Sequence, residues 1–335
     1  MLEVVITFLI LSLVFYVLFG GADFGGGIIE LFFGKKLGEK GKNTIYNAIA
    51  PVWEANHMWL IIVIVILFMG FPPVYTGIST YLHLPITAVL VGIVVRGTAF
   101  TFRHYDAIKD RSQIYYDILF KWSSLWTAFF FGVVTGSMVL GRINPDLQSF
   151  PDLFVFPWLN LFCFSIGIFT CCIFAFLASI YLIGESDSDT KPIFIKIGKI
   201  LNIATVASGG LVFLSAYSSG FDMLNKFIAS GFSIIALVLA TISLPLLWYS
   251  LNKDYSIMSR LVAGFQTLMI MVAWFDINFP VVLKYENSIE FSLIKDTAPE
   301  ATLTILALAL LIGSLFILPF LYYLLRIFKF RKENV

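Results

Sequence analysis

The stretch Asn47-Ala-Ile-Ala-Pro-Val-Trp-Glu-Ala-Asn-His-Met-Trp-Leu60 decides how the chain is interpreted. It opens an apolar run that continues to Met69, and it places a carboxylate, Glu54, and an imidazole, His57, in the first turns of a predicted membrane-spanning helix. An ionisable side chain at that depth costs at least about 2.5 kcal/mol unless a partner or water meets it. These two side chains are therefore the first candidates for function.

The composition is that of an integral membrane protein. Hydrophobic residues make up 59% of the 335 residues and charged residues only 13%, whereas soluble domains carry roughly 25% charged residues. Nearly every long segment is apolar, so we expect one polytopic membrane domain over residues 1–335 and no separate soluble domain. The net charge of +1 gives no reason to expect a nucleic-acid partner.

Nine apolar runs are long enough to cross a hydrocarbon core of about 30 Å. Because the runs are continuous and do not alternate apolar with polar residues, they predict helices rather than barrel strands, and hence an all-α fold. The first run exceeds one crossing, so it tilts or extends past the membrane surface. The expected bounds are 4–33, 48–70, 78–101, 117–140, 157–183, 197–219, 227–250, 257–283 and 302–327.

The Lys and Arg residues concentrate in alternate loops. The positive-inside rule then predicts an N-terminus outside the cell and a cytoplasmic C-terminus. The N-terminal Met1-Leu-Glu-Val has no basic residues and no small-residue cleavage site follows, so we expect the first run to be a retained span.

The first run ends Gly20-Gly-Ala-Asp23-Phe-Gly-Gly-Gly27-Ile-Ile-Glu30, which puts Gly20, Asp23, Gly27 and Glu30 on one helix stripe. Glycines allow close approach of a neighbouring helix in a membrane, so the stripe aims both carboxylates at a helix interface. The alternative is that these carboxylates lie at the level of the lipid headgroups, and for Glu30 this is the favoured interpretation.

Arg96 is the one Lys or Arg residue well inside a predicted span. The topology brings it to the same level as Asp23 and Glu54, so we expect a charge cluster from three consecutive helices. The arginine would keep one carboxylate ionised while burial favours the neutral form of the other, a balance suited to passing protons. The alternative is a static ion pair that only fixes helix packing.

Glu54-Ala-Asn-His57 also matches the Glu-x-x-His half-motif of di-iron bundles. Such sites need a second copy, and neither His83 nor His104 has an acid three residues before it. His57 likewise lacks a second axial candidate for haem ligation. We therefore expect no metal and no cofactor bound by this chain.

These residues resemble subunit II of the cytochrome bd quinol oxidases. The resemblance is carried by Gly21-Ala-Asp23-Phe-Gly-Gly-Gly27, by Arg96 with Phe100 and Arg103, and above all by the pattern Pro-x-Trp-[Asp/Glu]-x-Asn-x-x-Trp-Leu. It is strong over about residues 1–105 and weak beyond them. The pattern is filled by Pro51, Trp53, Glu54, Asn56, Trp59 and Leu60.

The resemblance implies a terminal oxidase that takes electrons from quinol and reduces dioxygen to water in the plasma membrane of a prokaryote. Haem b and haem d would lie in the partner, subunit I, and none in this chain. It also implies two four-helix bundles, roughly 1–140 and 157–283, and a peripheral helix at 302–327. Other expected contacts are membrane lipid and, as an open question, a small single-span subunit.

In the family, the acids matching Glu54 and Asp23 belong to a cytoplasmic proton pathway. We therefore assign Glu54, Asp23 and Arg96 to proton conduction, with a supporting set of side chains around them. Two departures bear on this assignment: many members carry an acid where this chain has Gly20, and another where it has Thr101. The supporting set is Trp53, Asn56, His57, Trp59 and Arg103.

Two other functions remain open at this point. One is a purely structural partner that stabilises the haem subunit. The other is a stand-alone ion or solute transporter, although such proteins often show internal repeats and helices broken at mid-membrane, and neither is evident in the sequence.

Overall fold

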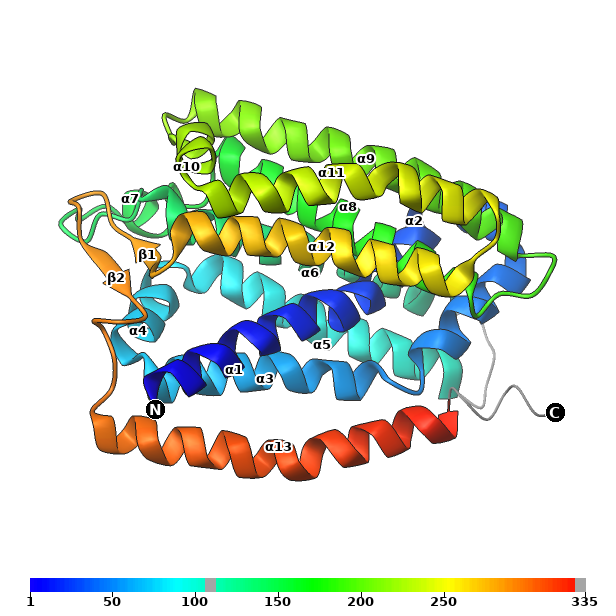
Figure 1. Ribbon diagram of the computed structural model, residues 1–335, viewed down its shortest axis with the longest axis horizontal. Coiled ribbons are helices and arrows are strands. Elements are labelled where there is room, and N and C mark those ends of the chain that lie inside the picture. Colours follow the sequence, from blue (N-terminus) through cyan, green and yellow to red (C-terminus); the bar gives the residue numbers. More distant parts are fainter. Residues whose placement is uncertain (106–112, 329–335) are drawn as a thin grey trace.

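In the computed structural model, which describes residues 1–105 and 113–328, long helices run side by side (Figure 1). Nine helical segments of the described chain are long and apolar enough to cross a membrane, which confirms the predicted number. The predicted topology places the C-terminus in the cytoplasm, and residues 329–335 lie outside the described part. The long helices are α1 (Leu2–Phe15), α2 (Gly21–Ile49), α3 (Trp53–Gly70), α5 (His83–Tyr105), α6 (Gln113–Leu140), α8 (Leu161–Ile183), α9 (Lys191–Ser218), α11 (Gly231–Asn252), α12 (Ser256–Asn278) and α13 (Glu300–Phe328).

The first run is longer in the structure than its predicted end at residue 33. Helix α1 passes through one turn of π-helix, η1 (Tyr16–Gly20), straight into α2, so one helical segment reaches from Leu2 to Ile49. Gly38 interrupts α2 with φ 60°, a conformation that glycine adopts without steric penalty. Pro51 lies in the turn before α3, because α3 begins at Trp53.

One end of the molecule carries short elements that the hydropathy pattern did not predict. Figure 1 shows them at the end where α1 begins. The predicted third span is present as His83–Arg103 in α5, but its predicted first residues, 78–81, belong to α4. The predicted eighth span ends early, at Asn278, before a two-stranded antiparallel sheet. The short elements are α4 (Pro72–Tyr81), α7 (Phe150–Phe154), α10 (Met223–Ala229), β1 (Val281–Lys284) and β2 (Glu290–Ser292).

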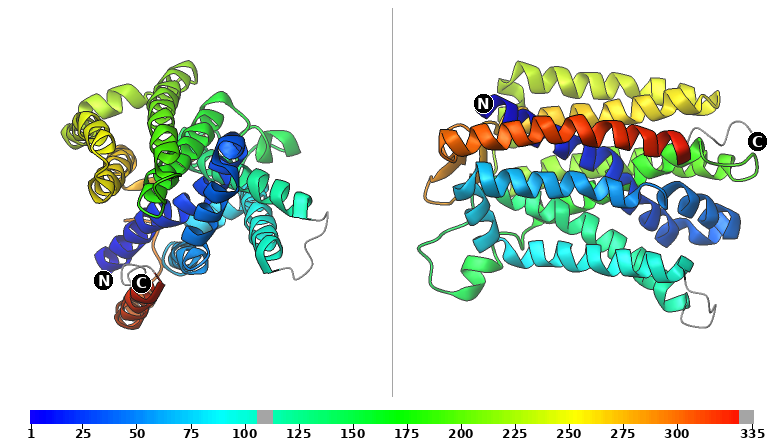
Figure 2. Two further views of the ribbon diagram at one scale, coloured as in Figure 1. Left: turned by 90° about the vertical axis from the view of Figure 1, so that its right-hand side faces the viewer. Right: turned by 90° about the horizontal axis from the view of Figure 1, so that it is seen from below.

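Helix α2 is central to the packing. It contacts both α6 and α8, while α5 packs on α6, α8 on α9, and α11 on α12. Helix α13 makes its main contacts with α1 and α3, and it lies at the rim of the molecule (Figure 2). The assignment of the last helix as the family's peripheral helix stays a prediction. The division of the other helices into two four-helix bundles stays a prediction.

The glycines of α2 allow this packing. A Cβ on Gly25 would lie 1.9 Å from the carbonyl oxygen of Phe174 in α8, and one on Gly27 would lie 2.2 Å from the Ser124 hydroxyl in α6. Small residues at such positions let helix backbones approach closely in a membrane, where packing replaces the hydrophobic effect as the driving force. Gly27 belongs to the stripe predicted from the sequence and faces α6, whereas Gly25, which lies outside that stripe, faces α8.

We expect Gly25→Ala to destabilise the protein, because the added methyl group meets the α8 backbone and not a flexible side chain. Overpacking of this kind typically lowers the free energy of unfolding by about 1–3 kcal/mol. The matched control is Gly34→Ala in the same helix, where an added Cβ has no atom within 4 Å. Apparent melting temperatures of the purified protein in detergent measure both, and equal values for the two variants would contradict the packing argument.

Candidate functional site

Glu54 lies in the first turn of α3 and its side chain is exposed on the surface of the isolated chain. It forms no hydrogen bond or ion pair with any residue that the structure describes. The sequence placed Glu54 in one cluster with Asp23 and Arg96, and the structure does not join it to them. Glu54 also differs from His57, three residues later, whose ring lies inside the molecule.

Asp23 is buried in the first turn of α2, with 4% of its surface exposed. Its Oδ2 accepts a hydrogen bond of 2.8 Å from the side-chain amide of Asn56 in α3. Asn56 lies two residues after Glu54. The first turn of α3 therefore carries the exposed carboxylate of Glu54 and also binds the buried carboxylate of Asp23. The family pattern thus places a donor for Asp23 beside the surface acid.

Arg96 is buried in α5, with 1% of its surface exposed. One terminal nitrogen donates to the backbone carbonyl of Asp23 at 2.7 Å, and Nε donates to the hydroxyl of Ser124 at 3.2 Å. The guanidinium carbon also lies 4.7 Å from the centre of the Phe24 ring and 5.4 Å from that of Phe120. Arg96 therefore connects α5 to both α2 and α6, and the predicted proximity of Arg96 and Asp23 is present.

The aromatic residues of the motif form a wall around this polar cluster. His57 lies between the rings of Tyr16, Phe24 and Trp53, at centroid distances of 6.3, 5.8 and 6.1 Å. Trp59 is buried against Phe15, 4.7 Å away. The imidazole is therefore packed among three aromatic rings. No three His, Cys, Asp or Glu side chains gather as metal ligands within the described residues.

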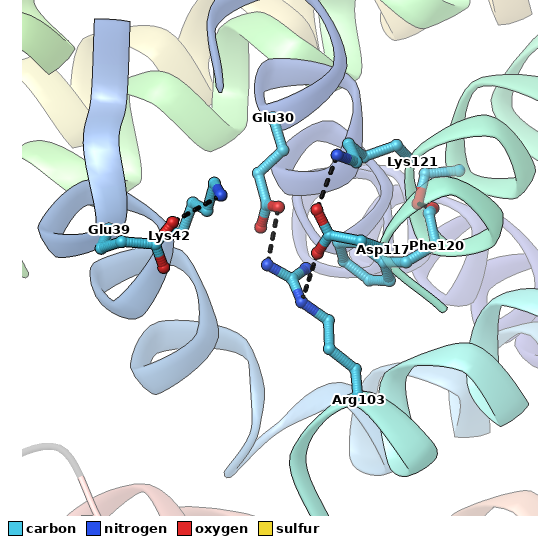
Figure 3. A network of polar contacts seen from close by, with 8 residues as sticks. Glu30, Glu39, Lys42, Arg103, Asp117, Phe120 and Lys121 are labelled. Carbon is cyan, nitrogen blue, oxygen red and sulfur yellow. Dashed lines mark hydrogen bonds and ion pairs between the residues drawn. The ribbon is translucent and has the colours of Figure 1, made fainter. Parts of the chain in front are cut away.

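A second charged cluster lies about two turns farther along α2. Glu30 is 3% exposed, so within this chain it is buried in protein, whereas the sequence favoured a solvated position at the headgroups. One terminal nitrogen of Arg103 lies 2.9 Å from a Glu30 oxygen, and Nε lies 2.8 Å from Asp117 in α6. Lys121 pairs with the other oxygen of Asp117 at 2.7 Å. Figure 3 shows Arg103 between the two carboxylates.

Sequence reasoning found part of these clusters and missed the rest. Asp117 and Lys121 are spaced i,i+4 at the start of a predicted span, and that spacing signals a helical ion pair. Ser124, one turn beyond Phe120, gives no signal of its own in an apolar run. Tyr16 was also missed, since nothing in the sequence marks a single π turn.

We expect Arg103→Met to lower the free energy of unfolding by about 3–5 kcal/mol, because it leaves Glu30 buried without its cation. A double variant, Arg103→Met with Glu30→Gln, should recover much of that loss, since Asp117 keeps Lys121. The control is Lys40→Met, which breaks a fully exposed ion pair with Asp189 and should leave stability unchanged. Thermal unfolding of the purified protein measures all three, and equal destabilisation by the single and double variants would contradict this account.

Comparison with known proteins agrees with the motif. Residues 1–328 match the family model described as cytochrome bd terminal oxidase subunit II. Subunit 2 of cytochrome bd ubiquinol oxidase from Bacillus subtilis is 31% identical over 129 residues, which are 38% of this chain and 34% of that protein. Subunit 2 of cytochrome bd-I ubiquinol oxidase from Escherichia coli is 28% identical over 143 residues, 42% of this chain and 34% of that protein.

These alignments span about a third of the length of either relative. The fold match is broader: the structure of bd oxidase from Geobacillus thermodenitrificans superimposes with a TM-score of 0.77 at 17% identity, covering 98% of both chains. The family model covers nearly the whole sequence, the motif residues occupy neighbouring turns of α2, α3 and α5, and the fold agrees. The chain therefore belongs to the cytochrome bd terminal oxidase subunit II family, and the nine apolar helical segments of its described residues are those of a multi-pass membrane protein.

Proposed function

We propose that this chain is the non-haem subunit of a quinol oxidase. Electrons pass from quinol through haem b and haem d in the partner subunit to dioxygen, which is reduced to water. The family assignment supports this role. The complex lies in the plasma membrane of a prokaryote, with the N-terminus of this chain outside.

The chain's own contribution is to carry protons from the cytoplasm to the partner. The observation that carries this proposal is the exposed carboxylate of Glu54 in the first turn of α3. A carboxylate on the outer face of a membrane helix is costly in lipid, and a partner subunit that covers it removes that cost. A carboxylate at such an interface is in reach of both chains and is suited to pass a proton from one to the other.

The remaining residues divide into relay and positioning groups. Asp23 is the relay on the cytoplasmic side, held in place by Asn56. Arg96 positions the first turn of α2 through the Asp23 carbonyl and supplies positive charge beside the carboxylate. Trp53 and Trp59 shield the cluster, and Arg103 fixes the neighbouring helix ends through its ion pairs.

The two departures from the family pattern have structural counterparts. An added Cβ at Gly20 would lie 2.9 Å from the Tyr16 ring, so the tyrosine occupies the place beside that position. Thr101 donates to the carbonyl of Gly97 in its own helix and is exposed. We infer a proton path with fewer carboxylates than in many members, in which Asp23 is the last acid before Glu54.

The test replaces Glu54 with Gln, which keeps the shape of the side chain and removes its proton transfer. We expect oxygen consumption by the purified two-subunit complex to fall by about 100-fold, the usual effect of losing a positioned proton carrier. The haem absorption spectrum should not change. Glu3→Gln is the matched control, since Glu3 is also an exposed acid in the first turn of a membrane helix, at the opposite end. Full turnover in Glu54→Gln would sink the proton-carrying role.

A structural role is the second candidate, and one observation favours it. Arg96 is fixed by two hydrogen bonds and two aromatic rings, and Glu54 has no direct contact with that cluster within the described residues. A purely structural subunit predicts that Glu54→Gln either has no effect or lowers haem content together with activity. Membership of the oxidase family leaves the stand-alone transporter without support.

A further inference from the structure

Two buried polar atoms beside the Asp23 cluster have no hydrogen-bond partner among the described residues. They are the hydroxyl oxygen of Tyr16, in the π turn, and Nδ1 of His57, in α3. Tyr16 is only 4% exposed, and the two rings lie 6.3 Å apart. A buried polar atom without a partner costs about 1–3 kcal/mol, so two such atoms in adjacent rings call for a common explanation.

The surroundings of these two atoms are polar on one side and apolar on the other. Arg96 interacts electrostatically with both side chains, and Asp23 interacts with Tyr16. The opposite side is closed by Phe131, whose ring lies edge-on to Tyr16 at 5.4 Å, and by Phe24. The aromatic side chains exclude bulk water, while the nearby charged groups favour binding of a small polar molecule.

The backbone at Tyr16 is itself unusual. Tyr16–Gly20 forms a single turn of π-helix between two α-helices, and such turns occur frequently at functional sites. Gly20, at the end of this turn, leaves the tyrosine ring room that any larger residue would take. The first residue of this turn thus has its hydroxyl buried inside the molecule, with its ring next to that of His57.

We propose that Tyr16 and His57 form an internal binding site for ordered water, which extends the Asp23–Asn56 polar pair into the bundle. Buried waters typically make about three hydrogen bonds to otherwise unpaired polar groups, and here the Tyr16 hydroxyl and His57 Nδ1 supply two of them. The water would serve as a proton-holding group on the inner side of Asp23. That use rests on the proposed function, whereas the occupancy of the site does not.

The direct test is an electron cryomicroscopy map of the purified two-subunit complex at a resolution that shows ordered internal water. We expect density within hydrogen-bonding distance of both the Tyr16 hydroxyl and His57 Nδ1, and its loss in Tyr16→Phe. The proposal is overturned if other internal waters are visible and this position is empty, or if both atoms are bonded to protein groups of either subunit.

Stability supplies a second measurement. If water bridges the two rings, Tyr16→Phe removes one of its partners and lowers the apparent melting temperature of the complex. If the hydroxyl is unpaired, removing it is neutral or stabilising, and that result contradicts the proposal. Tyr249→Phe is the matched control, because Tyr249 is exposed on α11 and the same atom is removed there.

The two proposals fail in different ways. Glu54→Gln should abolish most turnover and leave the water density at Tyr16 and His57 unchanged. Normal turnover in Glu54→Gln with that density present refutes the proton role of Glu54 and keeps the water site. Slow turnover in Glu54→Gln, with no water density at Tyr16 and His57, keeps the proton role of Glu54 and refutes the water site.

Discussion

The burial of the Arg96 guanidinium is the constraint on which the arrangement of α2, α5 and α6 depends. A guanidinium stays charged in proteins, and inside a membrane protein its hydrogen-bond donors must all find partners. The structure satisfies them with a backbone carbonyl of α2, a hydroxyl of α6 and the faces of two phenylalanine rings. None of the three helices can rotate or slide without breaking one of these contacts.

The glycines of α2 make that arrangement possible. Arg96 reaches the Asp23 carbonyl because α2 lies close to α6 and α8, and α2 lies close because Gly25 and Gly27 present no side chain there. One stretch of the sequence, Gly-Ala-Asp-Phe-Gly-Gly-Gly, therefore provides both the polar cluster and the close packing. The second cluster, around Arg103 and Glu30, fixes the same helices about two turns farther along.

The sequence predicted what depends on one helix at a time. Hydropathy predicted the nine spans, and 3.6-residue spacing predicted that Asp23 and Glu30 share one face of the helix, with Asp23 at a helix interface. The sequence did not predict three features that depend on neighbouring helices. These are the exposure of Glu54, the ion pairs that bury Glu30, and the environment of Tyr16. Helix rotation decides these, and rotation follows from packing against helices distant in sequence. The short elements α4, α7 and α10 were missed because they are too short to change an average over a membrane-spanning window.

Because of the π turn between them, α1 and α2 can be rotated differently about their helix axes. Each residue of an α-helix advances the side-chain direction by about 100°, so one residue more or less before Asp23 would turn Gly25 away from α8. A π turn takes up one extra residue without breaking the helix. The contacts of α1 with α3 and α13 are therefore set independently of the contacts that α2 makes with α6 and α8.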